Sequence, residues 1–181
     1  MDDAGGTREE RFTRLYDAHY SDVRAYAWRR EPDTADDIVA ETFTIAWQRL
    51  DRIPAEPLPW LIGVARNVRR NLQRGERRRR EREALCASSD VIPSPAGGIE
   101  ARSSLGVALQ GLADRDREIL QLAAWEGLDR ASLAAALGCS RATVAVRLSR
   151  ARRRLLAALT AAEAPPRTGA ASSRGRITDE C

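Results

Sequence analysis

The stretch that decides the fold is Gly127–Leu159, with the sequence GLDRASLAAALGCSRATVAVRLSRARRRLLAAL. It predicts two helices joined by a tight turn. Asp129 is placed to cap a first helix, Arg130–Leu137, by accepting hydrogen bonds from its free backbone N–H groups. Gly138 follows, where a residue in the left-handed conformation ends a helix at little cost. Ser140 is then the cap of a second helix.

The second of these helices carries a dense arginine load. Its apolar residues recur at helical spacing, at Val144, Leu148, Ala151 and Leu155. Its other faces carry six arginines and no acid, at Arg141, Arg147, Arg150, Arg152, Arg153 and Arg154. This pattern is typical of a helix-turn-helix whose second helix meets nucleic acid. An ordinary helical hairpin with a solvated basic face is the alternative that this stretch leaves open.

The distribution of charge supports nucleic-acid binding better than the amount of charge. The chain has 181 residues and all 30 of its basic residues are arginine, so arginine abundance reflects a compositional bias. Residues 61–82 nevertheless hold nine arginines against two acids, and residues 141–154 hold six against none. Residues 1–60 hold 13 acids against eight arginines. We therefore expect a polyanion to bind the basic blocks and a basic protein surface to meet the acidic parts.

Several classes of protein are excluded by what the chain lacks. The three cysteines, Cys86, Cys139 and Cys181, are far apart and show no CxxC spacing, so neither a disulfide framework nor a zinc site is predicted. His19 is the only histidine, which argues against a metal centre or a catalytic triad. We expect no cofactor and no catalytic residue. No apolar run approaches the ~20 residues of a membrane span, and no signal peptide is evident, so we expect a cytoplasmic protein with no membrane insertion.

The first half of the chain predicts three amphipathic helices, at about residues 9–30, 34–50 and 59–74 or beyond. The second has an acidic outer side. A stiff loop with three prolines, Asp51–Pro59, precedes the third. The third helix carries arginines and asparagines and ends in the run Arg77–Arg80, which we interpret as a strip that contacts phosphates.

The second half follows a segment rich in Ser, Pro and Gly. Further helices are expected at about residues 99–111 and from Asp114, before the helix-turn-helix. The predicted fold is all-α, with two small helical domains at residues 9–82 and 105–160. A flexible linker, residues 83–104, joins them, and a disordered tail covers residues 161–181.

With both halves in view, the chain resembles the extracytoplasmic-function sigma factors of bacterial RNA polymerase. The resemblance rests on four blocks that occur in the family's order. They are DDIVAETF at 36–43 with Ala46-Trp47, PWLIGVARN at 59–67, RDREIL at 115–120 with WEGL at 125–128, and LGCSRATV at 137–144 with RLSRAR at 147–152.

The resemblance implies a function and a set of site residues. The function is binding of core RNA polymerase and promoter-specific initiation through the −10 and −35 elements, and family members are frequently held inactive by an anti-sigma factor. Polymerase binding falls on Asp36, Asp37, Glu41 and Gln48. Binding of −10 DNA falls on Arg66, Asn67, Arg69, Arg70, Asn71 and Arg74, with the proline loop as the wall of a base pocket. Binding of −35 DNA falls on Ser140, Arg141, Thr143, Val146, Arg147, Arg150, Arg153 and Arg154.

Two departures from the family pattern stand out. Ala145-Val146 replaces a common Lys-Ser in the recognition helix, so Val146 either contacts a thymine methyl group or packs. Gly63 replaces a larger residue, which is expected to loosen or kink the third helix. The alternatives from other classes are a stand-alone helix-turn-helix regulator and an RNA-binding or scaffold module. Promoter-specific transcripts with core polymerase would discriminate a sigma factor from both.

Overall fold

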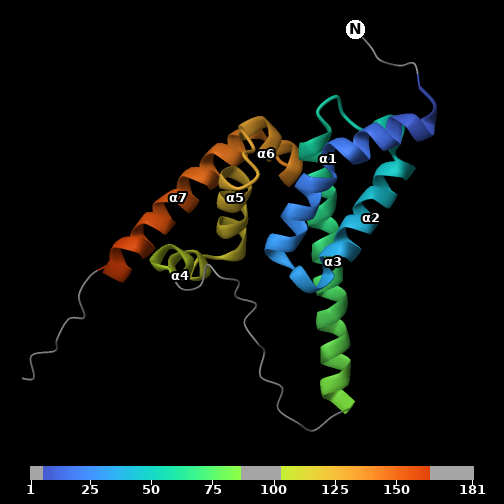
Figure 1. Ribbon diagram of the computed structural model, residues 1–181. Helices are drawn as coiled ribbons and strands as arrows, with labels where there is room; N and C mark the ends of the chain where they lie inside the picture. The colour runs from blue at the N-terminus through green and yellow to red at the C-terminus, as the bar shows by residue number, and fades with distance from the viewer. Residues whose placement is uncertain (1–5, 87–102, 164–181) are drawn as a thin grey trace, which may run out of the picture.

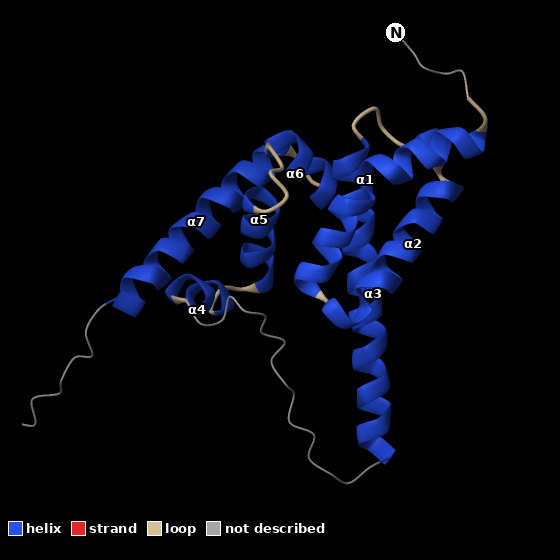
Figure 2. Cartoon of the chain, in the orientation of Figure 1, coloured by secondary structure: helices blue, strands red, loops and turns tan. Residues whose placement is uncertain are grey.

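The structure is a computed structural model that describes residues 6–86 and 103–163 (Figure 1). The described residues are helical and contain no strand (Figure 2). Two short 3₁₀ turns, Pro32–Thr34 and Leu50–Arg52, flank the second helix. The helices in chain order are α1 (Arg8–Arg30), α2 (Ala35–Gln48), α3 (Pro57–Cys86), α4 (Ser104–Gln110), α5 (Asp114–Ala124), α6 (Arg130–Leu137) and α7 (Arg141–Glu163).

Helices α1, α2 and α3 form the N-terminal unit. A capping box starts α1, because the Thr7 hydroxyl accepts from the Glu10 N–H at 3.2 Å and the Glu10 carboxylate accepts from the Thr7 N–H at 2.9 Å. The apolar faces of the three helices meet in a core that includes Tyr26, Ile38 and Leu61, all fully buried. The predicted three-helix arrangement is confirmed for these residues.

Helix α3 extends well beyond residue 74, the point at which the sequence left its end open. It begins at Pro57, two residues earlier than expected, and continues to Cys86 without a break, so that its C-terminal half projects beyond the other helices (Figure 1). Three ion pairs four residues apart support this half: Arg77–Glu81 at 2.7 Å, Arg79–Glu83 at 2.8 Å and Arg80–Glu76 at 3.2 Å. The arginine run is therefore the surface of a helix, and the first four residues of the expected linker, 83–86, belong to that helix.

Helices α4 to α7 form the C-terminal unit. Ser103 caps α4 by accepting from the Gly106 N–H at 3.0 Å. Ile119, Leu122, Leu133 and Val144 are buried in its core. Helix α7 extends to Glu163, so the first residues of the expected tail are helical. The remaining predictions for the linker and the tail concern residues 87–102 and 164–181, which lie outside the described residues, as does Cys181.

The local geometry of the helix-turn-helix confirms its predicted caps. The Asp129 carboxylate accepts from the Ser132 N–H at 2.7 Å, and this hydrogen bond holds the pKa of Asp129 below its usual range. Gly138 adopts φ 63° and ψ 40°, the left-handed conformation that glycine enters without strain. The Ser140 hydroxyl accepts from the Thr143 N–H at 3.1 Å and starts α7.

The two units pack directly against each other through α3 and α6. Gly63 of α3 lies where a Cβ atom would come within 3.1 Å of the Ala136 carbonyl oxygen. Helix α3 runs through Gly63 without interruption. Gly63 therefore does not produce the expected kink. Its lack of a side chain instead allows the backbone of α6 to approach α3 closely.

Among the described helices, none combines the length and the apolar composition that crossing a bilayer requires.

Candidate functional sites

The outer face of α2 is acidic and free of ion pairs. Asp36, Asp37, Glu41 and Gln48 are all exposed, and none of the three acids has an ion-pair partner among the described residues. The opposite face is fixed in the core, where the buried Thr42 hydroxyl donates to the Ile38 carbonyl oxygen at 2.6 Å. Because these carboxylates form no ion pairs among the described residues, the acidic face of α2 is available to bind a basic surface.

Trp47 supports this face from its inner edge. Its ring lies edge-on to Phe12, with the ring centroids 5.2 Å apart, and the Arg8 guanidinium lies 5.0 Å above it. Arg8 also donates to the Trp47 carbonyl oxygen at 2.6 Å. Trp47 is half-buried between α1 and α2.

The six candidate residues for the −10 element divide into two groups on α3. Asn67, Asn71 and Arg74 are exposed, and Arg74 donates to the Asn71 side-chain oxygen at 2.6 Å. The other three, Arg66, Arg69 and Arg70, are half-buried and point towards the C-terminal unit. Of the four arginines among these candidates, Arg74 therefore faces solvent. The other three, Arg66, Arg69 and Arg70, already have partners within the chain.

Those partners are glutamates. The Glu118 carboxylate of α5 accepts from Arg66 through two hydrogen bonds of 2.8 and 3.0 Å, and from Arg70 at 3.1 Å. Arg69 lies 3.5 Å from the same carboxylate and 3.4 Å from that of Glu31. Sequence reasoning missed Glu118, because a single glutamate on a short helix carries no local signal of a partner some 50 residues away.

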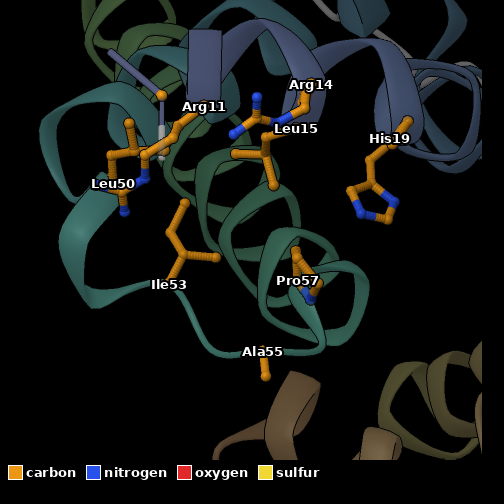
Figure 3. A pocket seen from close by; sticks show the side chains of 10 residues that line it. Arg11, Arg14, Leu15, His19, Leu50, Ile53, Ala55 and Pro57 are labelled. Atoms are coloured by element: carbon orange, nitrogen blue, oxygen red, sulfur yellow. The ribbon is translucent and has the colours of Figure 1, made fainter. Parts of the chain in front are cut away.

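A groove runs between α1 and the proline loop (Figure 3). Its volume is about 710 Å³. Arg11, Arg14 and His19 come to it from α1, facing Ile53 of the loop and Pro57 at the start of α3 (Figure 3). The loop was predicted to be a pocket wall, whereas the α1 residues were not predicted. These α1 residues reach the groove because α1 packs against α3. The spacing of residues along α1 does not reveal that packing.

The start of this loop is tied to the N-terminus of α1. Asp51 forms ion pairs with Arg8 and Arg11, each at 3.0 Å. The hydrogen bond from Arg11 is the main reason why the pKa of the Asp51 carboxyl lies below its usual range, and Arg8 adds to the effect. The loop thus has a fixed anchor at one end of the groove.

The −35 candidates on α7 also differ in their surroundings. Arg141, Arg147, Arg150 and Arg153 are exposed, and none of them forms an ion pair within the described ranges, 6–86 and 103–163. Ser140 and Thr143 hydrogen-bond to each other through their hydroxyls at 2.8 Å. Arg154 forms an ion pair with Asp116 of α5, whose side chain is only 12% exposed. Arg154 is thus tied into the fold of the unit.

The exposure of Val146 bears on the two alternatives that the sequence left open, packing and contact with a thymine methyl group. Its side chain is 50% exposed, so it does not pack in the core. It lies on the solvent side of α7, near the exposed Arg147 and Arg150. An apolar side chain at this place is free to meet an apolar group of a ligand, such as a thymine methyl group.

A helix-turn-helix with a basic second helix, together with a second basic helix in another unit, defines the class: a two-unit, all-helical DNA-binding protein. Comparison with known proteins then places it in a family. The family model described as Sigma-70 region 2 matches residues 15–79, and the one described as Sigma-70, region 4 matches residues 102–155.

Individual relatives agree with the family models. The chain is 34% identical over 131 residues to the ECF RNA polymerase sigma factor EcfG of Rhodopseudomonas palustris, covering 70% of this chain and 72% of that one. It is 38% identical over 139 residues to the probable RNA polymerase sigma factor RfaY of Xanthomonas campestris pv. campestris. That match covers 71% of this chain but 34% of the relative, so the chain spans about a third of that protein.

A solved structure supports the same assignment. The sigma factor RpoE of Bartonella quintana, in a co-crystal with the anti-sigma factor NepR, is similar with a TM-score of 0.56 and 27% identity, over 82% of this chain and 96% of that one. The chain belongs to the ECF family of RNA polymerase sigma factors. Members of this family are initiation factors of transcription, which accounts for two DNA-facing units in one chain.

Proposed function

We propose that the acidic face of α2 binds a basic surface of core RNA polymerase through Asp36, Asp37, Glu41 and Gln48. The support is that the three carboxylates are exposed and have no partner among the described residues. This unpaired acidic face, in a chain that also carries two basic helices, is the observation on which the proposal depends. We place the protein in the cytoplasm, where polymerase and DNA are found.

Helix α3 and the groove beside the proline loop would act on the −10 element. Exposed Asn67 offers both a donor and an acceptor for a base edge, and Asn71 and Arg74 lie on the next two turns of the helix. Capture of an unstacked base needs a pocket with phosphate contacts beside it. The groove lined by Ile53 and Pro57 has apolar walls, with Arg11 and Arg14 at its rim.

Helix α7 would read the −35 element in the major groove. Its N-terminus enters the groove first, which gives Arg141, Thr143, Val146 and Arg147 access to base edges. Arg150 and Arg153, farther along the helix, would hold phosphates. Arg154 would contribute less, because its guanidinium is paired with Asp116, and Ser140 keeps the helix start in place.

An anti-sigma factor is a further partner that the relatives suggest. The similar RpoE structure contains NepR, and a similar structure of CnrH contains the cytosolic domain of CnrY. We propose that such a regulator binds this chain and competes with polymerase or promoter DNA.

The experiment that tests polymerase binding reverses the charge of α2. We expect the double substitution Asp37→Arg with Glu41→Arg to abolish co-purification with core polymerase while the helical circular dichroism spectrum is retained. A matched control, Glu9→Arg with Asp17→Arg, makes the same change of charge at two exposed acids of α1. Normal co-purification of the α2 variant, or equal loss in the control, would count against this assignment.

A further inference from the structure

The groove between α1 and the proline loop combines apolar walls with polar side chains from one helix only. Its walls include Leu15, Leu50 and Ile53. Its polar lining side chains are Arg11, Arg14 and His19, all from α1 (Figure 3). Among the described residues, no carboxylate and no carboxamide lines it. Its volume of about 710 Å³ lies within the range of about 300–1,000 Å³ that is typical of sites for small organic ligands.

Of the two arginines in the groove, Arg14 is the unpaired one. Arg11 donates to an Asp51 carboxylate oxygen at 3.0 Å, which ties its guanidinium to the start of the loop. Arg14 is exposed and forms neither an ion pair nor a side-chain hydrogen bond in the described part of the chain. A Cβ atom on Gly6 would lie 3.2 and 3.3 Å from its two terminal nitrogens, so the glycine leaves room for this guanidinium. Arg14 therefore keeps its planar fork of N–H donors for a ligand.

His19 presents a flat ring to the same groove (Figure 3). Its side chain is 21% exposed, and its Nδ1 atom lies 4.0 Å from the Asp22 carboxylate, which is too far for a hydrogen bond. Nδ1 has no hydrogen-bond partner within residues 6–86 and 103–163. Histidine rings are among the side chains on which unstacked bases stack. An aromatic face thus lies beside an unpaired guanidinium, and recognition of an unstacked base needs both a stacking surface and groups that bind the base edge.

The donors of Arg14 discriminate among the four bases. Guanine offers two adjacent acceptors on one edge, N7 and O6, whereas adenine and cytosine place an amino group there and thymine offers one acceptor beside a methyl group. An arginine fork satisfies both acceptors of guanine, but it meets an amino group with donor against donor. A polar group that loses its water and gains no partner weakens binding. Because no carboxylate or carboxamide of the described residues lines the groove to accept from an amino group, guanine is the base that fits it.

We propose that the groove binds an unstacked guanine of the promoter strand, with Arg14 donating to its O6 and N7 atoms and His19 stacked on its ring. This role of the groove rests on the proposed function of the N-terminal unit in recognition of the −10 element. It adds the identity of one base and a reading residue on α1, where the sequence placed none. Arg52, next to Ile53 in the chain, is exposed and forms no ion pair in the described ranges, so a cation for the phosphate of this nucleotide is close by.

The test uses the chain assembled with core polymerase, on promoter templates whose nontemplate strand is randomised over a pre-opened −10 segment. Templates retained in polymerase complexes are sequenced for the wild type and for each variant. Arg14→Ala removes the guanidinium, and Arg14→Lys keeps the charge but loses the planar fork. The control Arg24→Ala makes the same change of charge as Arg14→Ala at an exposed arginine of α1 that does not line the groove. Circular dichroism verifies that each variant is folded.

We expect the wild type and the control to enrich guanine at one position at least fivefold over each other base, because a bidentate arginine–guanine pair is worth about 5- to 150-fold. Both Arg14 variants should lose this preference, while preferences at other positions persist. An unchanged guanine preference in both variants, or no position at which the wild type favours guanine, would overturn the proposal. A wild-type chain that enriches no sequence beyond core polymerase alone would overturn the proposed function as well.

Two base analogues at the preferred position test which edge is read. Hypoxanthine keeps O6 and N7 and should be retained as well as guanine, whereas 7-deazaguanine lacks N7 and should be retained at least fivefold less. Equal retention of 7-deazaguanine and guanine would contradict reading of this edge by Arg14. His19→Ala should lower retention of guanine templates without a change of preferred base, because stacking tolerates every base, and undiminished retention would refute the stacked arrangement.

A free guanine nucleotide carries the same acceptors, so competition separates the two sources of guanine. The wild-type selection is repeated in millimolar GMP. The guanine preference should persist, because a base in the bound strand is held beside the groove at a high effective concentration. Disappearance of the preference would assign the groove to a free nucleotide and overturn the proposal.

Discussion

Arg153 and Arg154 are neighbours in the sequence, and both were predicted to hold −35 phosphates, but their surroundings predict different behaviour. Arg153 is exposed and forms no ion pair in the part of the chain that the structure describes. Its replacement by alanine removes one phosphate contact, which lowers the slope of log K against log salt by about 0.9. The factor by which DNA affinity falls between about 50 and 200 mM salt is then about 3.5 times smaller for the variant than for the wild type. Stability changes by less than about 0.5 kcal/mol.

Arg154→Ala leaves the Asp116 carboxylate, with its side chain 12% exposed, without its cation. Loss of a partner costs about 3–5 kcal/mol for a fully buried pair and about 0.2–1 kcal/mol for an exposed one. Because Arg154 itself is 59% exposed, we expect a value between these, about 1–2 kcal/mol. That corresponds to a melting temperature lowered by about 2–8 °C for a chain of this size.

The assay combines thermal unfolding, followed by circular dichroism, with fluorescence anisotropy of the full chain on a short DNA duplex across a salt series. The expected result is a crossed pattern: Arg153→Ala changes the salt slope and keeps the melting temperature, whereas Arg154→Ala lowers the melting temperature and changes the slope less. If both variants change the slope equally and melt like the wild type, the ion pair with Asp116 does not hold Arg154 and the reasoning is refuted.

Three further predictions concern single residues. Asn67→Ala should reduce open-complex formation, seen as lower permanganate reactivity of the melted promoter region; full reactivity would remove Asn67 from base recognition. Leu133→Ala, at a core position 1% exposed, should lower the free energy of unfolding by about 2–5 kcal/mol in urea, and a loss below 1 kcal/mol would contradict the packing of α6. Burial raises the pKa of Tyr26 above 10.0, so its proton is released first from the unfolded chain and stability falls as pH rises above about 10. Tyr26→Phe should lessen this alkaline loss of stability, and an unchanged pH dependence of the urea midpoint would argue against it.

Much of the fold could be predicted because its signals are local. The caps Asp129 and Ser140 and the left-handed Gly138 act within four residues of their own helix ends, so the sequence around them contains the whole of their physical cause. The same holds for the apolar spacing that places α1 and α2 in the core. The sequence left the end of α3 open, at residue 74 or beyond. The helix continues past Gly75 because the pairs Arg77–Glu81 and Arg79–Glu83 outweigh the helix-breaking tendency of that glycine.

The rest of the candidate site depends on contacts between residues that are distant in the sequence. Nothing near Glu118 indicates that its partners are Arg66 and Arg70, because the pairing arises only when α5 packs beside α3. Gly63 was noticed as a departure from the family pattern, but its cause, the approach of Ala136, required the packed structure. The arginines that the sequence assigned to DNA alone thus have a second partner inside the chain.

The central claim is that one chain directs core polymerase to promoters through two separate DNA-facing units. The most direct measurement is in vitro transcription of fragmented genomic DNA by core polymerase, with and without the purified chain, followed by sequencing of transcript 5′ ends. The account predicts a small set of new start sites that share one element near −10 and another near −35. Transcript ends identical to those of core polymerase alone would contradict it.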